Sequence, residues 1–195
     1  MCRDRLLERL KEPAPGRIQI LTEPRQVGKT TLLLDLAAQF GDAAVYAAVD
    51  EPDAALPGFL ERRWADAETR AQRGMAVLLL DEIHHIGDWA KRLKGYWDDL
   101  RRRHLSLHVV ATGSSALRVA TGSRESLAGR FERLTLSHWS ASSLTDIFQI
   151  PAHEAALEVV RFGSYPGAVA LQKDQLRWRA YIKDAIINLR LAEMC

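Results

Sequence analysis

Short apolar runs alternate with amphipathic segments along the first two thirds of the chain. The alternation predicts strands at residues 17–22, 43–49, 76–80, 105–111 and 131–136. Three helices are expected between them, at residues 28–40, within residues 56–71, and after Asp88. Asp88 is in position to cap the third of these helices. The run at 76–80 has no polar interruption, as is typical of a strand buried on both faces. This order predicts an α/β fold, a five-stranded, mainly parallel sheet with helices on both faces.

The pattern changes after Ser137. Helical periodicity covers residues 140–150, 154–162, 166–173 and 175–193, and no strand is expected between them. We therefore expect two parts, a sheet-containing core at residues 1–137 and a small, lid-like helical subdomain at residues 138–195.

Composition places the chain in the soluble globular class. It has 195 residues, of which 47% are hydrophobic and 27% charged, and its longest apolar stretches are well short of the roughly 18 residues of a membrane span. Residues 1–11 mix charge with leucine and lack the features of a secretory signal. We expect a cytoplasmic protein with no membrane partner.

Charge and cysteine content exclude further classes. A net charge of +2 is too mild to indicate nucleic-acid binding by itself. Basic residues at 91–103 are interrupted by Asp98 and Asp99, so a solvated helix face is favoured there and a nucleic-acid partner is not. Two cysteines, Cys2 and Cys195, cannot build a disulfide framework. The histidines at 84, 85, 104 and 108 lack zincin spacing, so metal binding through histidine is not expected.

A phosphate-binding loop is predicted between the first strand and the first long helix. Gly28-Lys29-Thr30 opens that helix, where backbone N–H groups can hold phosphate oxygens. Lys29 would reach the β- and γ-phosphates, and the Thr30 hydroxyl would bind Mg²⁺. The alternative is a helix that merely begins with these three residues. The candidate nucleotide-binding residues are Arg25, Gln26, Val27, Gly28, Lys29, Thr30 and Thr31.

Glu23 occupies the position where the Gly-x4-Gly-Lys-Thr pattern begins with glycine. Its carboxylate would repel nucleotide phosphates if it faced them, and a backbone that required glycine would be strained. Alternatively, Glu23 points away and pairs with Arg25. Both alternatives remain open at this point.

Asp81 and Glu82 end the apolar strand at 76–80. Ligands bind open α/β sheets at the carboxyl ends of the strands, so Asp81 would hold Mg²⁺ through water and Glu82 would polarise the attacking water. On the alternative interpretation, the pair ends a strand and caps the next helix.

Thr112 to Ser115 follow another strand, where hydroxyls could sense the γ-phosphate or form an ordinary turn. Arg130, before the last strand, is either a phosphate-contacting arginine or a solvated one.

Several motifs together resemble prokaryotic AAA-type ATPases. They are Pro24-Arg25-Gln26-Val27-Gly28-Lys29-Thr30-Thr31, Leu80-Asp81-Glu82-Ile83-His84 with Asp88-Trp89, Ala111-Thr112-Gly113-Ser114-Ser115, Ser126-Leu127-Ala128-Gly129-Arg130 and Phe162-Gly163-Ser164-Tyr165-Pro166. More narrowly, the chain is similar to a bacterial and archaeal AAA+ family whose loop contains Pro-Arg-Gln-Val-Gly-Lys-Thr. Members of that family usually continue into a C-terminal domain that this sequence does not contain.

The resemblance implies a P-loop NTPase core of the AAA+ type with ATP and Mg²⁺ as cofactors. Lys29 and Thr30 would belong to Walker A, Asp81 and Glu82 to Walker B, Ser114 to a sensor, and Arg130 to an arginine finger. Glu82, Arg130 and Ser114 are then the catalytic candidates, and Thr30 and Asp81 the metal ligands. The implied function is an Mg²⁺-dependent ATPase that couples nucleotide state to movement, acting on an unknown protein client, with homo-oligomerisation open. The alternative is a nucleotide-binding or interaction module with weak or no turnover, because of Glu23 and the missing domain.

Overall fold

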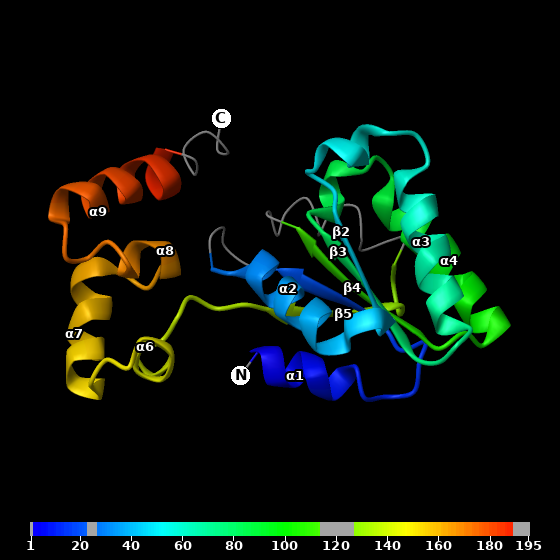
Figure 1. The fold of residues 1–195 in the computed structure, drawn as a ribbon, viewed down its shortest axis with the longest axis horizontal. Helices are drawn as coiled ribbons and strands as arrows, with labels where there is room; N and C mark the ends of the chain where they lie inside the picture. The colour runs from blue at the N-terminus through cyan, green and yellow to red at the C-terminus, as the bar shows by residue number, and fades with distance from the viewer. Residues whose placement is uncertain (1, 23–26, 114–126, 189–195) are drawn as a thin grey trace. The chain divides into compact units, whose positions relative to one another are not determined.

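The computed structural model describes residues 2–22, 27–113 and 127–188 (Figure 1). By their internal contacts the residues group into two compact units. One contains Met1–Glu23 with Lys29–Leu136, and the other contains Pro24–Gly28 with Ser137–Cys195. We call them the sheet unit and the helical unit, and describe each by itself.

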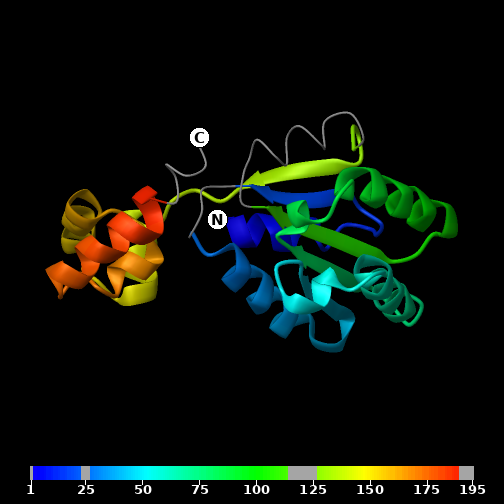
Figure 2. The same cartoon turned by 90° about the horizontal axis from the view of Figure 1, so that it is seen from above.

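The sheet unit is built on five strands that all run parallel. They are β1 (Ile18–Thr22), β2 (Ala44–Ala48), β3 (Ala76–Asp81), β4 (Leu107–Gly113) and β5 (Phe131–Thr135). Their order is β2-β3-β4-β1-β5, with β5 beside β1 at one edge (Figure 2). The predicted α/β fold with a parallel sheet is therefore confirmed.

Helices cover both faces of this sheet. Figure 1 shows α1 (Cys2–Arg9) and α2 (Lys29–Phe40) on one face, and α3 (Phe59–Ala71) and α4 (Trp89–Arg103) on the other. Short 3₁₀ turns η1 (Gly41–Ala43), η2 (Pro52–Ala55) and η3 (Ile83–His85) join the elements. Alternate strand residues such as Ile20 and Leu78 pack in one cluster with Trp64, Leu93 and Trp97 of α3 and α4. The period of two along the strands thus decides which residues meet which helix layer.

The register places functional positions at one edge. Thr22 of β1 pairs with Gly113 of β4, and Leu80 of β3 pairs with Ala111. The residues after Thr22 and Leu80 and the end of β4 therefore lie at the same carboxyl edge, which is where α/β sheets bind ligands.

The helical unit contains α6 (Ala141–Phe148), α7 (Ala152–Phe162), α8 (Pro166–Val169) and α9 (Gln175–Tyr181). One hydrophobic cluster in this unit is formed by buried Leu144, Ala155 and Val169, with Trp139, Ala141, Ile150 and Val159 packed against them. Ser140 and Asp174 cap α6 and α9 by accepting hydrogen bonds from the backbone N–H groups of Ser143 and Arg177. Among the described helices, none combines the length and apolarity that a membrane crossing requires.

Three local predictions differ from the structure. The helix expected at 166–173 is the four-residue α8, and the helix expected at 175–193 changes after Tyr181 to the π-helical turns η4 (Ile182–Asn188), with residues beyond 188 outside the description. Asp88 stands before α4 but its side chain makes no cap hydrogen bond, because its φ of 53° is left-handed and not the extended conformation of a capping residue.

Candidate functional site

Lys29 begins α2 directly after β1 and the predicted phosphate loop. Gly28 before it has a φ of 101°, a conformation that side chains with a Cβ rarely adopt, which explains glycine at this position. Lys29 is 7% exposed, and its Nζ lies 3.8 Å from Oε1 of Glu82. Lysine is rarely buried unless it is paired with an opposite charge, and the Glu82 carboxylate provides that charge here.

Asp81, the last residue of β3, is 2% exposed and held by two hydroxyl groups. The Thr112 hydroxyl donates to its Oδ1, and the Tyr46 hydroxyl donates to its Oδ2 at 3.2 Å. Burial, and then the negative charge of Asp81, raise the pKa of Tyr46 well above its usual value. The Tyr46 proton therefore stays in place to orient the carboxylate.

Glu82 follows with a left-handed φ of 52°. Its backbone N–H donates to Oγ1 of Thr112 at 3.0 Å, so one buried hydroxyl fixes both the Asp81 carboxylate and the Glu82 backbone. Its second carboxylate oxygen, Oε2, lies 3.1 Å from Nδ1 of His84. Glu82 is thus held between Lys29 on one side and His84 on the other.

The structure brings Lys29, Asp81 and Glu82 together at the carboxyl edge of the sheet. Thr30 and Thr31 lie exposed in the first turn of α2. In the helical unit, Val27 is buried and its carbonyl accepts a hydrogen bond from the Trp139 indole at 3.1 Å. Glu23, Arg25, Gln26 and Ser114 are outside the described residues.

Two neighbours of this group, Tyr46 and His84, were missed from the sequence. Tyr46 has the one side chain of the run at 43–49 that carries a hydroxyl, and this was the available signal. His84 was discounted because its sequence spacing matches no metal motif. Thr112 belonged to the predicted sensor group, but its contacts with Asp81 and Glu82 could not be read from the sequence.

Arg130 is not part of this group. Its carbonyl accepts a hydrogen bond from the N–H of Ile18, at the start of β1, whereas the phosphate loop follows the end of that strand; a five-residue strand spans roughly 13 Å. The Arg130 guanidinium donates to both carboxylate oxygens of Asp98, at 2.8 and 3.2 Å. This pair lowers the pKa of Asp98 below its usual range. Arg130 also lies over the Trp97 ring at 5.7 Å.

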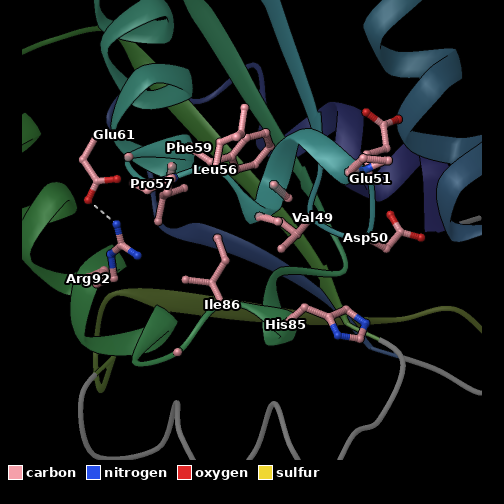
Figure 3. A pocket seen from close by; sticks show the side chains of 16 residues that line it. Val49, Asp50, Glu51, Leu56, Pro57, Phe59, Glu61, His85, Ile86 and Arg92 are labelled. Atoms are coloured by element: carbon pink, nitrogen blue, oxygen red, sulfur yellow. Dashed lines mark hydrogen bonds and ion pairs between the residues drawn. The ribbon is translucent and has the colours of Figure 1, made fainter.

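A hollow of about 660 Å³ opens beside the ends of β2 and β3 (Figure 3). Val49, Leu56 and Ile86 line it with apolar surface, and Glu61 forms an ion pair with Arg92 at its wall. His85, directly after His84, also lines the hollow and is exposed. The hollow therefore reaches His85, three residues after Glu82.

The sequence matches the model of one protein family, described as the AAA domain, over residues 15–145. The chain belongs to the AAA domain family. The matched range begins before β1 and contains every strand of the sheet. Membership supports a nucleotide-binding function of the ATPase type.

Solved structures share the fold of this AAA domain. The Thermotoga maritima RuvB Holliday junction branch migration motor matches with a TM-score of 0.57 and 18% identity, over 85% of this chain and 57% of RuvB. A katanin structure from work on katanin self-assembly matches with a TM-score of 0.52 and 15% identity, over 75% of this chain and 53% of katanin. This AAA domain therefore spans a little over half the length of either protein. No curated protein matches it by sequence.

Proposed function

We propose that this AAA domain binds ATP at the carboxyl edge of its sheet and hydrolyses it to ADP and phosphate. The observation that carries the proposal is the approach of Lys29 to Glu82, with Nζ 3.8 Å from Oε1, beside a buried Asp81. A cation at a helix N-terminus can bind phosphate, and a carboxylate beside it can orient and polarise the attacking water. These two chemistries at one sheet edge are what phosphoryl transfer to water requires.

Each residue of the group has a distinct proposed role. Lys29 leaves Glu82 to pair with the β- and γ-phosphates, and the freed Glu82 carboxylate orients and polarises water. Thr112 positions the Asp81 carboxylate and the Glu82 backbone through its single hydroxyl. Arg25, Gln26, Val27, Gly28, Thr30 and Thr31 complete the proposed nucleotide loop, and Ser114 is the proposed sensor.

The side chains present fit Mg²⁺. Asp81 and the Thr30 hydroxyl offer the oxygen donors that this ion prefers. The two Asp81 oxygens each accept one hydrogen bond and keep lone pairs for a water-mediated contact. Bound Mg²⁺ would neutralise charge on the phosphates, and Thr30 and Asp81 would hold it.

We place Arg130 in the site of a neighbouring copy. Arg130 lies just before β5, about one strand length away from the phosphate loop of its own chain. Its ion pair with Asp98 would hold the side chain in place when no neighbouring copy is bound. The proposed assembly is a homo-oligomer in which one protomer supplies the arginine and the next supplies Lys29 and Glu82. This role is worth several orders of magnitude in rate in other nucleotide hydrolases.

We further propose residues 1–137 as the ATPase core and 138–195 as a lid-like part that moves with nucleotide state. The hydrogen bond from the Trp139 indole to the Val27 carbonyl supports this coupling, since Val27 belongs to the proposed phosphate loop. The same proposal includes membership of the narrower bacterial and archaeal family with the Pro-Arg-Gln-Val-Gly-Lys-Thr loop. It also includes a cytoplasmic location and an unidentified protein client.

The test is ATP binding by calorimetry and phosphate release with and without Mg²⁺. Lys29→Ala should abolish ATP binding, because the phosphate charge loses its main cationic partner. Glu82→Gln should keep affinity within about threefold and lower turnover at least about 100-fold, in the range expected for removing a general base. Lys183→Ala, an exposed lysine of the helical unit, is the control. Unchanged affinity in Lys29→Ala, or unchanged turnover in Glu82→Gln, would refute the assignment.

A second candidate, nucleotide binding without turnover, is supported by Glu23 at the first loop position. The same experiment separates the two, because the second predicts ATP affinity in the wild type with no phosphate release. Mixing Arg130→Ala with Glu82→Gln chains adds a test of the oligomer. Activity restored on mixing supports a shared site, and no restoration contradicts it.

A further inference from the structure

Three side chains with metal-ligating atoms meet where β3 ends. Glu82, His84 and His85 each place one carboxylate oxygen or ring nitrogen within 4.8 Å of the other two. The His84 and His85 rings lie against each other, with centroids 4.2 Å apart. The sequence argument against a histidine metal site considered spacing on an α-helix, whereas these residues lie on a tighter turn.

Backbone hydrogen bonds fix the turn that carries the three side chains. Glu82, with its left-handed φ of 52°, precedes the 3₁₀ turn η3, which contains His84 and His85. The His85 N–H donates to the Glu82 carbonyl at 3.1 Å, and the Glu82 N–H donates to Thr112 at 3.0 Å. A turn fixed at both ends holds its side chains in place without a ligand, which reduces the cost of binding one.

The closest pair in this cluster is the Oε2 atom of Glu82 and the Nδ1 atom of His84, which are 3.1 Å apart and both buried from solvent. Two lone pairs at this distance would repel, so either a hydrogen atom or a metal ion lies between the two atoms. An Nδ1–H group on His84 would supply the hydrogen atom, and a metal ion would instead bind both atoms. Ligand atoms about 3.4 Å apart are what tetrahedral bonds of 2.0 to 2.1 Å give.

We propose that Glu82, His84 and His85 form a binding site for a divalent transition metal ion of the zinc class. Two imidazoles and one carboxylate form a donor set that zinc accepts, with water as the fourth ligand. Mg²⁺ prefers oxygen ligands and would not compete for the imidazoles. His85 is exposed and lines the hollow beside η3 (Figure 3), so one of the three ligands is open to solvent.

The consequence is regulatory and rests on the proposed function. An ion on Oε2 of Glu82 holds the carboxylate that must turn toward water when Lys29 moves to the phosphates. Zinc-class ions at this site therefore inhibit hydrolysis while leaving Lys29 available for nucleotide. The predicted signature is lower turnover at unchanged ATP affinity.

Binding is tested with Co²⁺ as a visible probe for a tetrahedral site and Zn²⁺ as its competitor. The protein is the full chain with Cys2→Ser and Cys195→Ser, because thiolates bind the same ions. One equivalent of Co²⁺ should give ligand-field absorption that Zn²⁺ abolishes. His84→Ala and His85→Ala should each weaken Zn²⁺ binding at least about tenfold. His153→Ala, an exposed histidine in α7, should not.

Absence of Co²⁺ absorption, or equal Zn²⁺ affinity in the His84→Ala, His85→Ala and His153→Ala proteins, would overturn the site and leave a hydrogen bond from the His84 Nδ1–H group as the explanation of the contact. This readout needs no ATP, so it is independent of the proposed function. Circular dichroism of each variant shows whether it is folded, and His85→Ala, at an exposed position, keeps the test valid if His84→Ala does not fold.

Inhibition is tested by phosphate release with stoichiometric Zn²⁺ and its reversal by a chelator selective for zinc over magnesium. The His84→Ala, His85→Ala double variant should lose sensitivity to Zn²⁺ at least about tenfold. If zinc binds but does not lower the rate of phosphate release by the wild type, the proposed inhibition is refuted and the proposed metal site is not. A wild type that releases no phosphate without zinc refutes the proposed function and leaves the binding result standing.

Discussion

The sheet unit and the helical unit bury their apolar side chains to very different extents. In the sheet unit, four strands and two helices contribute to one continuous cluster that includes Leu78, Leu80 and Trp64. In the helical unit, the described cluster has Leu144, Ala155 and Val169 as its buried members, while Val160 and Leu176 are 84% and 80% exposed. Apolar burial is the main favourable term in folding. The comparison therefore indicates that the sheet unit is the stable frame for the site, and that the helical unit opens at lower free energy.

The largest effect is expected from truncating the larger core. Leu78 is fully buried in β3, so Leu78→Ala should lower the free energy of unfolding of the sheet unit by about 3 to 4 kcal/mol. Leu144→Ala should instead remove hydrogen-exchange protection in α6 and α7 while the sheet amides stay protected. Chemical denaturation followed by hydrogen exchange measures both. Loss of protection across the whole chain in Leu144→Ala would show that the two units unfold together.

A smaller effect is expected at the hydroxyl that joins Asp81 to Glu82. Thr112→Val keeps the side-chain shape but leaves a buried carboxylate oxygen and a backbone N–H without this partner. The expected cost is about 1 to 3 kcal/mol in unfolding free energy, with lower ATP turnover because the Asp81 carboxylate and the Glu82 backbone lose the hydrogen bonds that position them. Thr135→Val, at an exposed position in β5, should change neither quantity. An equal loss of stability without loss of turnover would make Thr112 purely structural.

The sheet unit should also become less stable in mild acid through His108. This β4 residue is 3% exposed, and burial lowers its pKa below the ordinary value of about 6.5. The unfolded chain therefore binds the proton more readily, so stability is full above about pH 6.5 and falls as pH drops toward the folded-state pKa. His108→Gln should flatten this slope between pH 7 and 5, and exposed His153→Gln should not. Identical slopes in all three proteins would contradict the assignment.

The smallest effect is expected on the exposed apolar side chains of the helical unit. Val160→Ala and Leu176→Ala should each change the free energy of unfolding by no more than about 0.5 kcal/mol, as is usual for surface substitutions. Thermal denaturation of the two variants beside the wild type measures this. A loss above 2 kcal/mol in either would show that the side chain is buried in solution, and would weaken the contrast between the units.

The features that the sequence predicted depend on residues close together in the chain, whereas those found only in the structure depend on contacts between distant residues or on backbone conformation. The strands, the long helices and Gly28-Lys29 at the opening of α2 were predictable, because each depends on the periodicity or chemistry of neighbouring residues. Shorter elements were less predictable, since the helix expected at 166–173 ends at Val169 and is followed by turns. The strained turn at Glu82 and the uncapped Asp88 were not predicted, because a left-handed backbone is invisible in residue type when the residue is not glycine.

The sequence by itself determined the five strands and the long helices of the sheet unit, and it predicted Lys29, Asp81 and Glu82 as residues of one site. The tertiary structure alone decided that Thr112 meets Asp81, that Lys29 approaches Glu82, and that Arg130 lies with Asp98 at the start of β5. The physical reason is strand order. Periodicity reports which face of an element is buried, but β4 lies between β1 and β3 because of packing among segments far apart in sequence, and that packing brings these partners together.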